Sequence, residues 1–441
     1  MYVASKFPKH NSLSGWVAML AQRKPAPSLS SVVSVDVAII GAGFAGLSAA
    51  RRLSQLDPTL KVAVLEAGVV GEGATGRNSG FIIDLPHEVS SEDFGDTSTE
   101  RARRDIFLYR TAIGLATDMA DEFGWGREVL DRCGRYSVAI SAKGDEHIRS
   151  YARQLDGLGE AHRILDGDQI HEVTGCPMYT SGLFMPGTVM VQPAAYIRAV
   201  ADGLRAPVSV YENTPVQRFE KTGSTWQLKT PQGTVSAGKI ILANNGHAES
   251  FGLFKGTLLH VFTYASLSEP FDPKRLSGQR DWAATPALPM GTTVRRISSE
   301  QGDRLLIRSR YSYHAGLEIS ERHIRAAGRV HDQKFATRFA GLPDVQMQYR
   351  WGGPMALTVN SVPVFGEVEN GLYAAIACNG LGASKSTAAG IAAAENVLGL
   401  DSRMVQILSG YEQPKKLPPQ PLLSIGAKAN LRLREWRAGR E

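Results

Sequence analysis

A strand-like apolar run that leads into three spaced glycines is the feature that most constrains how this chain can fold. Residues 35–40 read Val-Asp-Val-Ala-Ile-Ile, and Gly41, Gly43 and Gly46 follow them at the start of a helical pattern. In such a unit the first glycine allows a tight turn, the second lets the backbone approach a pyrophosphate, and the third lets the helix pack close to the strand. The start of the helix then offers free N–H groups to the phosphates. The pattern predicts a dinucleotide-binding turn, and a purely structural glycine turn is the alternative.

A second strand pattern ends in an acidic residue at the expected distance. Residues 61–65 read Lys-Val-Ala-Val-Leu and lead into Glu66, about twenty residues after the glycine turn. A carboxylate at this position can accept hydrogen bonds from ribose hydroxyls. Besides the three glycines, the cofactor-binding candidates of this first unit are Phe44, Ala45, Glu66 and Ala67.

The segment that follows contains little that a core could bury. Residues 71–81 read Gly-Glu-Gly-Ala-Thr-Gly-Arg-Asn-Ser-Gly-Phe. Small residues allow backbone to lie close to a flat ligand, and the polar side chains supply hydrogen bonds. A flexible surface loop is the alternative, but the position directly after the ribose-binding acid favours ligand binding. The candidates here are Gly73, Ala74, Thr75, Arg77, Asn78, Ser79 and Gly80.

This segment resembles the Gly-Ala-Ser-Gly-Arg-Asn-Gly-Gly signature of the D-amino-acid-oxidase-like flavoproteins, with conservative departures at Thr75 and Ser79. The resemblance is to the branch of gamma-glutamylputrescine oxidoreductases and sarcosine-oxidase-like amine oxidases. It implies FAD rather than NAD, bound along this segment. It also implies an α/β fold in which a Rossmann-type FAD-binding domain is interleaved with an antiparallel-sheet substrate domain.

Three further segments resemble the family in chain order, so that the resemblance covers residues 34–400. Residues 239–247 resemble the strand and turn that close over the dinucleotide, and Ala243 and Asn244 are binding candidates there, with Val216 on a preceding strand. Residues 351–366 resemble a Trp-x-Gly segment, although asparagine replaces the usual aspartate at position 360. Residues 371–390 resemble the C-terminal flavin motif.

The C-terminal motif again reads as a strand, a glycine turn and an alanine-rich helix. A helix start aimed at the pyrimidine edge of the flavin would stabilise the negative charge that develops on reduction. The candidates are Gly380, Leu381, Gly382, Ala383, Ser384 and Lys385. Sarcosine-oxidase-like members carry a lysine in the comparable helix, with spacing that differs by about a residue. Lys385 could act at the flavin or the substrate, or it could be an exposed lysine at the helix cap, and both alternatives are open.

The best substrate-side candidates lie in residues 303–314, which resemble the family strand beside the flavin. Strict alternation would place Arg308 and Arg310 on one face and Tyr311 and Tyr313 on the other. Two arginines on one face could clamp a substrate carboxylate, and a solvated strand face is the alternative.

Other side chains near the predicted pocket are ambiguous. His260 occupies another family strand beside the pocket, although core packing would also explain it, and His87 is similarly ambiguous. In the family, covalent flavin is held by a cysteine near the position of Gly353 or by a histidine in place of Asn78. Since this chain has neither, noncovalent FAD is predicted.

Composition agrees with a large enzyme of two interlocked domains, because 441 residues with 43% hydrophobic content exceed what one core normally supports. A formal charge of +6 does not indicate a nucleic-acid partner. Three scattered cysteines, Cys133, Cys176 and Cys378, indicate neither a disulfide framework nor a metal site and suit a cytoplasmic location. No apolar run is long enough to span a membrane, and residues 14–21 are interpreted as an arm packed on the enzyme rather than a signal peptide.

The predicted domain order alternates along the chain. It runs through an N-terminal arm (1–34), the first FAD-binding part (35–90), a helical region with the first substrate part (91–190), the second FAD-binding part (191–250), the second substrate part (251–346), the C-terminal FAD-binding part (347–400) and a peripheral basic tail (401–441).

The resemblance implies oxidation of a carbon–nitrogen bond in a primary or secondary amine by hydride transfer to flavin N5. The expected substrates are gamma-glutamylated polyamines or N-substituted amino acids, and the imine product hydrolyses to an aldehyde or keto acid plus an amine. Oxygen or another acceptor would reoxidise the flavin, and the oligomeric state is left open. The alternatives are a membrane-peripheral dehydrogenase that feeds quinone through the basic tail, an NAD-dependent reductase, and a noncatalytic FAD-holding subunit.

Overall fold

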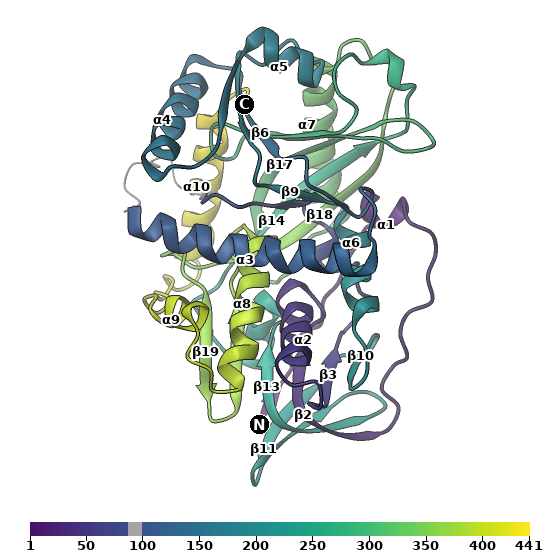
Figure 1. Cartoon of the computed structure of the whole chain (residues 1–441), viewed down its shortest axis with the longest axis vertical. Coiled ribbons are helices and arrows are strands. Elements are labelled where there is room, and N and C mark those ends of the chain that lie inside the picture. The colour runs from purple at the N-terminus through teal and green to yellow at the C-terminus, as the bar shows by residue number, and fades with distance from the viewer. Residues whose placement is uncertain (87–98) are drawn as a thin grey trace.

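The computed structural model describes residues 1–86 and 99–441, so His87 and the predicted boundary after residue 90 lie outside the described residues. Figure 1 shows two lobes, with α2 and α8 in the lower lobe and α4, α5 and α7 in the upper lobe; α3 runs between them. The helices are α1 (Gly15–Ala18), α2 (Phe44–Leu56), α3 (Thr99–Phe123), α4 (Ala142–Leu158), α5 (Gly167–Thr174), α6 (Pro193–Gly203), α7 (Glu321–Arg338), α8 (Gly382–Val397), α9 (Arg403–Ser409) and α10 (Leu422–Ala438).

A nine-stranded sheet forms the lower lobe. Its central strands run parallel in the order β10, β3, β2, β13 and β20, and antiparallel strands flank them. The strands are β1 (Tyr2–Val3), β2 (Val32–Ile40), β3 (Val62–Leu65), β10 (Val208–Tyr211), β11 (Arg218–Thr222), β12 (Thr225–Lys229), β13 (Thr234–Leu242), β19 (Val364–Glu369) and β20 (Leu372–Ile376). The parallel centre confirms the predicted α/β class.

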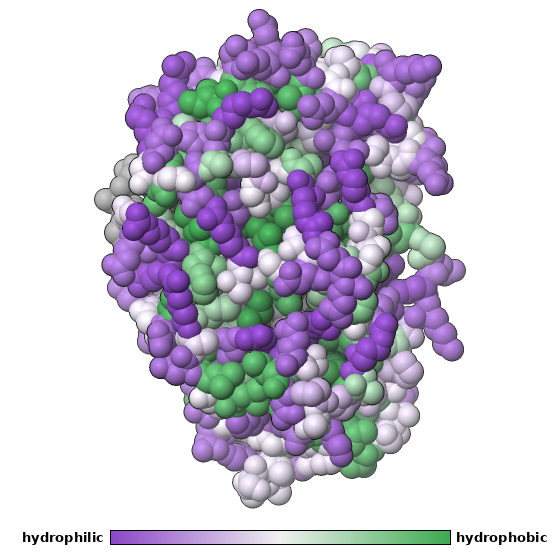
Figure 2. All heavy atoms as spheres, in the orientation of Figure 1, coloured by the Kyte–Doolittle hydropathy of each residue, from purple (hydrophilic) through white to green (hydrophobic). Residues whose placement is uncertain are grey.

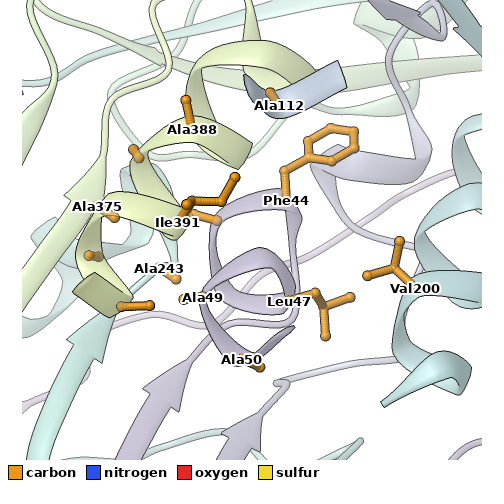
Figure 3. Packing of buried hydrophobic residues seen from close by; sticks show 14 of the residues in the cluster. Phe44, Leu47, Ala49, Ala50, Ala112, Val200, Ala243, Ala375, Ala388 and Ile391 are labelled. Carbon is orange, nitrogen blue, oxygen red and sulfur yellow. The ribbon is translucent and has the colours of Figure 1, made fainter. Parts of the chain in front are cut away.

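The helices that cover this sheet pack through small residues. Figure 3 shows Phe44, Leu47 and Ala49 of α2 beside Ala388 and Ile391 of α8, all within one buried apolar cluster. A methyl group in place of the hydrogen at Gly390 would overlap the backbone of α2. This close approach holds the starts of both helices near the same end of the sheet.

An eight-stranded sheet forms the upper lobe in the order β18, β14, β17, β16, β15, β6, β8 and β7. Neighbouring strands are antiparallel except for the parallel pair β15 and β6. The strands are β6 (Arg135–Ala139), β7 (Arg163–Asp166), β8 (Ser181–Met185), β14 (Leu259–Ser268), β15 (Trp282–Pro286), β16 (Thr293–Ile297), β17 (Arg304–Tyr313) and β18 (Met347–Leu357). Because β18 pairs with β14 here, the chain leaves this sheet after residue 357 rather than at the predicted boundary of 346.

A small three-stranded sheet shares no strand pairing with the two large ones. It contains β4 (Phe81–Ile82), β5 (Leu130–Asp131) and β9 (Val189–Val191), with β9 in the middle.

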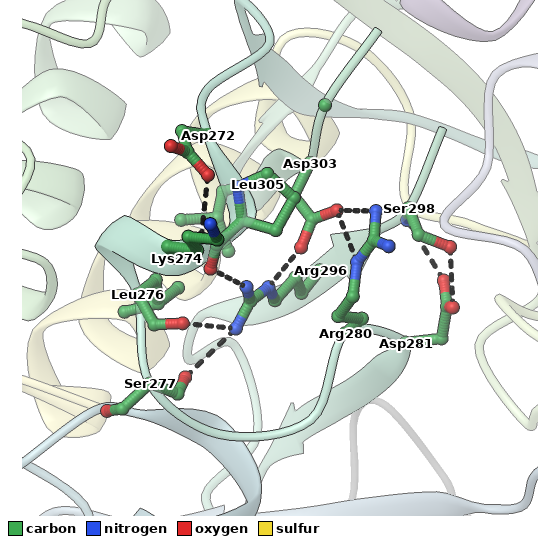
Figure 4. Close-up of polar contacts among 12 residues, drawn as sticks. Asp272, Lys274, Leu276, Ser277, Arg280, Asp281, Arg296, Ser298, Asp303 and Leu305 are labelled. Carbon is green, nitrogen blue, oxygen red and sulfur yellow. Dashed lines mark hydrogen bonds and ion pairs between the residues drawn. The ribbon is translucent and has the colours of Figure 1, made fainter. Parts of the chain in front are cut away.

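A buried charge network fixes the turn between β16 and β17 in the eight-stranded sheet. Asp303 is fully buried and accepts hydrogen bonds from Arg296 at 2.8 Å and from Arg280 at 2.7 Å, as Figure 4 shows. Arg296 also donates to the carbonyls of Leu276 and Ser277, each at 2.9 Å. Since a buried charge must be paired, these contacts tie the loop after β14 to the β16–β17 turn.

Both terminal segments pack against the lobes. Trp16 is fully buried, and its indole N–H donates to the carbonyl of Asn78 at 2.7 Å. The tail was predicted to be peripheral, but Glu441 is buried and its carboxylate accepts from Ser141 Oγ at 2.7 Å. This end of the tail is therefore held against the start of α4.

The surface of the view in Figure 2 is mainly hydrophilic, with apolar patches between charged side chains, one of them over α8 and β19. Across residues 1–86 and 99–441, no helix combines the length and apolarity needed to cross a membrane.

Candidate cofactor and substrate site

One cavity of about 520 Å³ brings the predicted motifs together. Glycine-rich turns of the nine-stranded sheet line one part of it, and β14, β16 and β17 line another. The predicted cofactor-binding residues in its lining are Gly41, Gly43, Phe44, Ala45, Glu66, Ala67, Gly73, Ala74, Thr75, Arg77, Asn78, Ser79, Val216, Ala243, Asn244, Gly380, Leu381, Gly382, Ala383 and Ser384. Segments far apart in the chain therefore share one cavity.

The first glycine turn has the geometry that the sequence predicts. Gly41 has a φ of +105°, and a β carbon there would lie 2.9 Å from the carbonyl oxygen of Ala243. Gly43 directly precedes α2, whose first N–H groups therefore face the cavity. Gly46 is outside the lining, because its role is packing: a β carbon would overlap the carbonyl of Gly41.

Glu66 closes this turn at the end of β3. Its carboxylate accepts from the backbone N–H of Ala42 at 2.9 Å and from that of Gly68 at 3.0 Å. Burial raises the pKa of Glu66, and the two backbone hydrogen bonds oppose that shift. Each carboxylate oxygen keeps a further lone pair, so ribose hydroxyls can still donate to it.

The segment of residues 71–81 is an ordered wall of the cavity rather than a flexible loop. The guanidinium of Arg77 is buried and donates to the carbonyls of Ser12 at 2.6 Å, Glu72 at 2.7 Å and Gly352 at 3.3 Å. Burial lowers the pKa of Arg77 to about 10. Arg77 therefore borders the cavity while most of its donors hold protein backbone in place.

Sequence reasoning missed a second arginine behind this wall. Arg295 is buried and donates to the carbonyls of Ser79 at 2.8 Å and Val191 at 2.9 Å. A side chain at Gly80, which is not in the cavity lining, would collide with this guanidinium. Arg295 is distant in sequence from the loop, so no local pattern could have revealed it.

The C-terminal turn places a second helix start at the cavity. Ala377, Asn379 and Gly380 have φ values of +64°, +49° and +87°, which turn the chain sharply from β20 into α8. Ser384 lines the cavity and donates to the carbonyl of Ile83 at 2.7 Å. Lys385 is not part of the lining, whereas Ser386 is.

The predicted alternation on β17 is wrong at Arg310. Tyr264 of β14 pairs with Ser309 and Thr263 pairs with Tyr311, so Arg310 forms a β-bulge with a φ of +64°. One extra residue reverses the alternation beyond it. Arg308 and Tyr311 therefore lie together in the cavity lining, where the Arg308 guanidinium is 4.8 Å from the Tyr311 ring centroid.

Arg310 is turned away from the cavity. Its guanidinium pairs with Glu435 of α10 at 2.6 Å, and the second carboxylate oxygen of Glu435 accepts from the backbone N–H of Tyr311 at 2.7 Å. The structure thus separates the two arginines that were predicted to form a clamp.

His260 is also outside the lining. It is buried, and its Nε2 atom lies 2.5 Å from a carboxylate oxygen of Glu249. These contacts fit the core-packing alternative for His260 better than a place in the substrate pocket.

Two other histidines that the sequence did not single out do line the cavity. His10 belongs to the N-terminal arm and His247 follows β13, and burial lowers the pKa of each to about 4. Both imidazoles are therefore neutral near pH 7. The arm also contributes Lys6 and Phe7 to the lining.

The cavity residues fit an adenine dinucleotide. The starts of α2 and α8 both face the cavity, and such helix starts favour anionic groups. Two lining atoms, Asn244 Oδ1 and His247 Nδ1, are buried without a hydrogen-bond partner among the described residues. Buried polar atoms normally have partners, so these two point to a ligand with complementary groups.

Comparison with known proteins agrees with this geometry. The family described as FAD dependent oxidoreductase matches residues 36–396. The chain is 27% identical over 416 residues to a probable oxidoreductase, OrdL, of Haemophilus influenzae, and the alignment covers 88% of each protein. It is 24% identical over 429 residues to gamma-glutamylputrescine oxidoreductase of Escherichia coli, and the alignment covers 89% of this chain and 90% of that protein. The crystal structure of glycine oxidase from Geobacillus kaustophilus superposes with a TM-score of 0.68 at 21% identity, over 84% of this chain and 96% of that one.

Proposed function

Because the chain belongs to the FAD-dependent oxidoreductase family, we propose that it oxidises the carbon–nitrogen bond of an amine that also carries a carboxylate. The substrate class is gamma-glutamylated polyamines or N-substituted amino acids, and the imine product hydrolyses to an aldehyde or keto acid plus an amine. Bound FAD, held noncovalently, supplies the two-electron acceptor. The observation that carries the proposal is the single cavity that the glycine-rich turns share with Arg308 and Tyr311.

Arg308 supports a carboxylate on the substrate. Its guanidinium lies in the cavity wall over the ring of Tyr311, and none of the ion pairs in the described part of the chain involves it. Besides its contact with the Tyr311 side chain, the planar guanidinium keeps further N–H donors available for a carboxylate. Arg308 would therefore bind and orient the acidic end of the substrate.

The same charge would favour the reactive form of the amine. An amine must be neutral for its lone pair to assist oxidation, and a nearby cation disfavours the ammonium form. His10 and His247, whose pKa values are lowered to about 4, add no positive charge near pH 7. Their neutral rings can accept a hydrogen bond from the amine without competing for its lone pair.

Anaerobic mixing of the holoenzyme with a panel of amines tests the proposal. N-substituted amino acids and gamma-glutamyl diamines should bleach the flavin absorbance near 450 nm, roughly the value for an oxidised flavin, much faster than plain alkylamines do. If no amine bleaches the flavin, the chain is instead a noncatalytic FAD-holding subunit.

Arg308→Met and Arg310→Met form a matched pair for the carboxylate contact. Loss of one charged hydrogen-bonding partner typically costs about 2–5 kcal/mol, which is a fall of roughly 30-fold to several thousandfold in kcat/KM. We expect that fall for Arg308→Met with acidic substrates, a much smaller change with alkylamines, and near-normal selectivity for Arg310→Met. If Arg308→Met lowered kcat/KM equally for acidic and neutral amines, the proposed contact between Arg308 and a substrate carboxylate would be refuted.

The proposal extends to the electron acceptor and the cellular location. Peroxide release in air distinguishes oxygen from another acceptor, because a quinone-linked dehydrogenase would reduce a dye rapidly with little peroxide. A cytoplasmic location is supported by the three free cysteines, Cys133, Cys176 and Cys378.

A further inference from the structure

The outward face of α10 is unusually apolar. The helix packs on the protein through Leu431 and Ala438, which join a cluster with Met290 and Tyr311. On the opposite face, the side chains that are most exposed are Leu422 (63%), Ile425 (64%), Leu433 (46%) and Trp436 (78%). At 100° per residue, the spacing of these four keeps them within an arc of about 80°. They form a continuous apolar stripe, the α10 stripe.

Positive charge lies beside the α10 stripe. Lys428 and Arg432 are exposed along one side of it, and Arg440 is exposed just after the C-terminal end of α10. The acidic residue of α10 and the one that follows it are turned inward, since the side chain of Glu435 is 9% exposed and Glu441 is 2% exposed. The outward face of α10 therefore combines large apolar side chains with cations and carries no exposed carboxylate.

We propose that α10 docks this protein on an anionic lipid surface. Helices that lie in a membrane interface have this composition, with large apolar residues on one face and lysine or arginine beside them. Tryptophan prefers the headgroup level, and each basic residue near an anionic leaflet gains about 1 kcal/mol. The charge pattern argues against pairing with a second copy of α10, because Lys428 and Arg432 would then face like charges.

The proposal is independent of the proposed function, because the four residues of the α10 stripe are not part of the cavity lining. Variants of the stripe can therefore be compared at equal amine-dependent flavin reduction. A docking failure and a failure of the amine reaction are in this way distinguishable.

Co-sedimentation of the holoenzyme with lipid vesicles is the first test. We expect binding to vesicles of equimolar phosphatidylcholine and phosphatidylglycerol, and at least about tenfold weaker binding to phosphatidylcholine alone. The double variant Leu433→Gln/Trp436→Gln should weaken binding about tenfold or more, and Lys428→Gln/Arg432→Gln should weaken it roughly fivefold per charge. Val32→Gln, at a residue 79% exposed on the other lobe, is the control and should bind normally.

Fluorescence locates the contact. Among the six tryptophans, Trp436 is 78% exposed, whereas Trp16, Trp226, Trp282 and Trp351 are at most 3% exposed. Brominated phosphatidylglycerol should quench the emission of Trp436, and Trp436→Phe should abolish that quenching while it keeps most of the binding.

Three results would overturn the proposal. The first is no preference for anionic vesicles, and the second is full binding by Leu433→Gln/Trp436→Gln. The third is a concentration-dependent dimer in vesicle-free sedimentation that this double variant abolishes, which would assign the α10 stripe to an interface between copies.

Discussion

The buried histidine behind β17 should make the protein sensitive to acid by an amount that the structure specifies. His331 of α7 is fully buried, with Nδ1 2.7 Å from Ser266 Oγ and Nε2 3.3 Å from the carbonyl of Ser309. Burial is the largest cause that lowers its pKa to about 3, and the nearby cations Lys334, Arg350 and Arg310 contribute to this shift. The imidazole is therefore neutral in the folded protein at any pH above about 4.

Proton linkage gives the sign and the size of the change in the free energy of unfolding with pH. In the unfolded chain this histidine has a pKa of about 6.5. Between pH 6.5 and pH 5 the unfolded state therefore binds a proton that the folded state does not bind. The contribution of neutral His331 to the free energy of unfolding is at its full value above pH 6.5. It falls as the pH decreases toward the pKa of the folded state. Each pH unit costs about 1.4 kcal/mol, so the loss between pH 8 and pH 5 is about 2 kcal/mol.

Urea unfolding of wild type and His331→Gln at pH 8 and pH 5, with FAD in excess, measures this loss. The amide of glutamine preserves hydrogen bonding but does not titrate, so the variant should lose about 2 kcal/mol less than wild type over this interval. His10, His247 and His314 also have lowered pKa values, and they titrate equally in both proteins. If wild type and variant lose the same stability between the two pH values, the buried neutral state of His331 is refuted.

Two further predictions concern the dinucleotide-binding turn and the C-terminal tail. Gly43→Val should fold but purify without yellow colour, because a β carbon at Gly43 meets only Thr75, at 3.3 Å, but stands where the pyrophosphate is expected to lie. Gly46→Val should instead fail to fold, and a yellow Gly43→Val protein would contradict the role of this turn in dinucleotide binding. Glu441→Ala should lower the free energy of unfolding by about 2–4 kcal/mol, because it leaves the backbone N–H groups of residues 140 and 141 without acceptors, and an unchanged urea midpoint would contradict this role.

The sequence predicts local features of the site well, because their chemistry is encoded by neighbouring residues. The turn at Gly41 follows from a strand, spaced glycines and a helix start, and the structure has that turn with a φ of +105°. The family resemblance and the FAD-dependent class are confirmed by the match over residues 36–396. These features require no knowledge of which distant segments meet.

Features that depend on distant contacts were missed or misjudged. Alternation with a period of two assumes an unbroken ladder, and the bulge at Arg310 breaks it by one residue. Arg295 and His10 reach the cavity wall from segments with no recognisable motif. The burial of Glu441 depends on the start of α4, about 300 residues earlier in the chain.

Glu435 links these observations, because it supplies a physical reason for the bulge that divides the two arginines. A non-glycine residue with a positive φ is costly and persists only where surrounding contacts compensate for it. At the bulge, Glu435 accepts from the backbone N–H of Tyr311 and pairs with the guanidinium of Arg310. Burial raises the pKa of Glu435, and the Arg310 charge opposes that shift. By holding Arg310 outside, α10 leaves Arg308 and Tyr311 as the pair that faces the cavity, so the helix that we expect at the lipid surface also shapes the cavity wall.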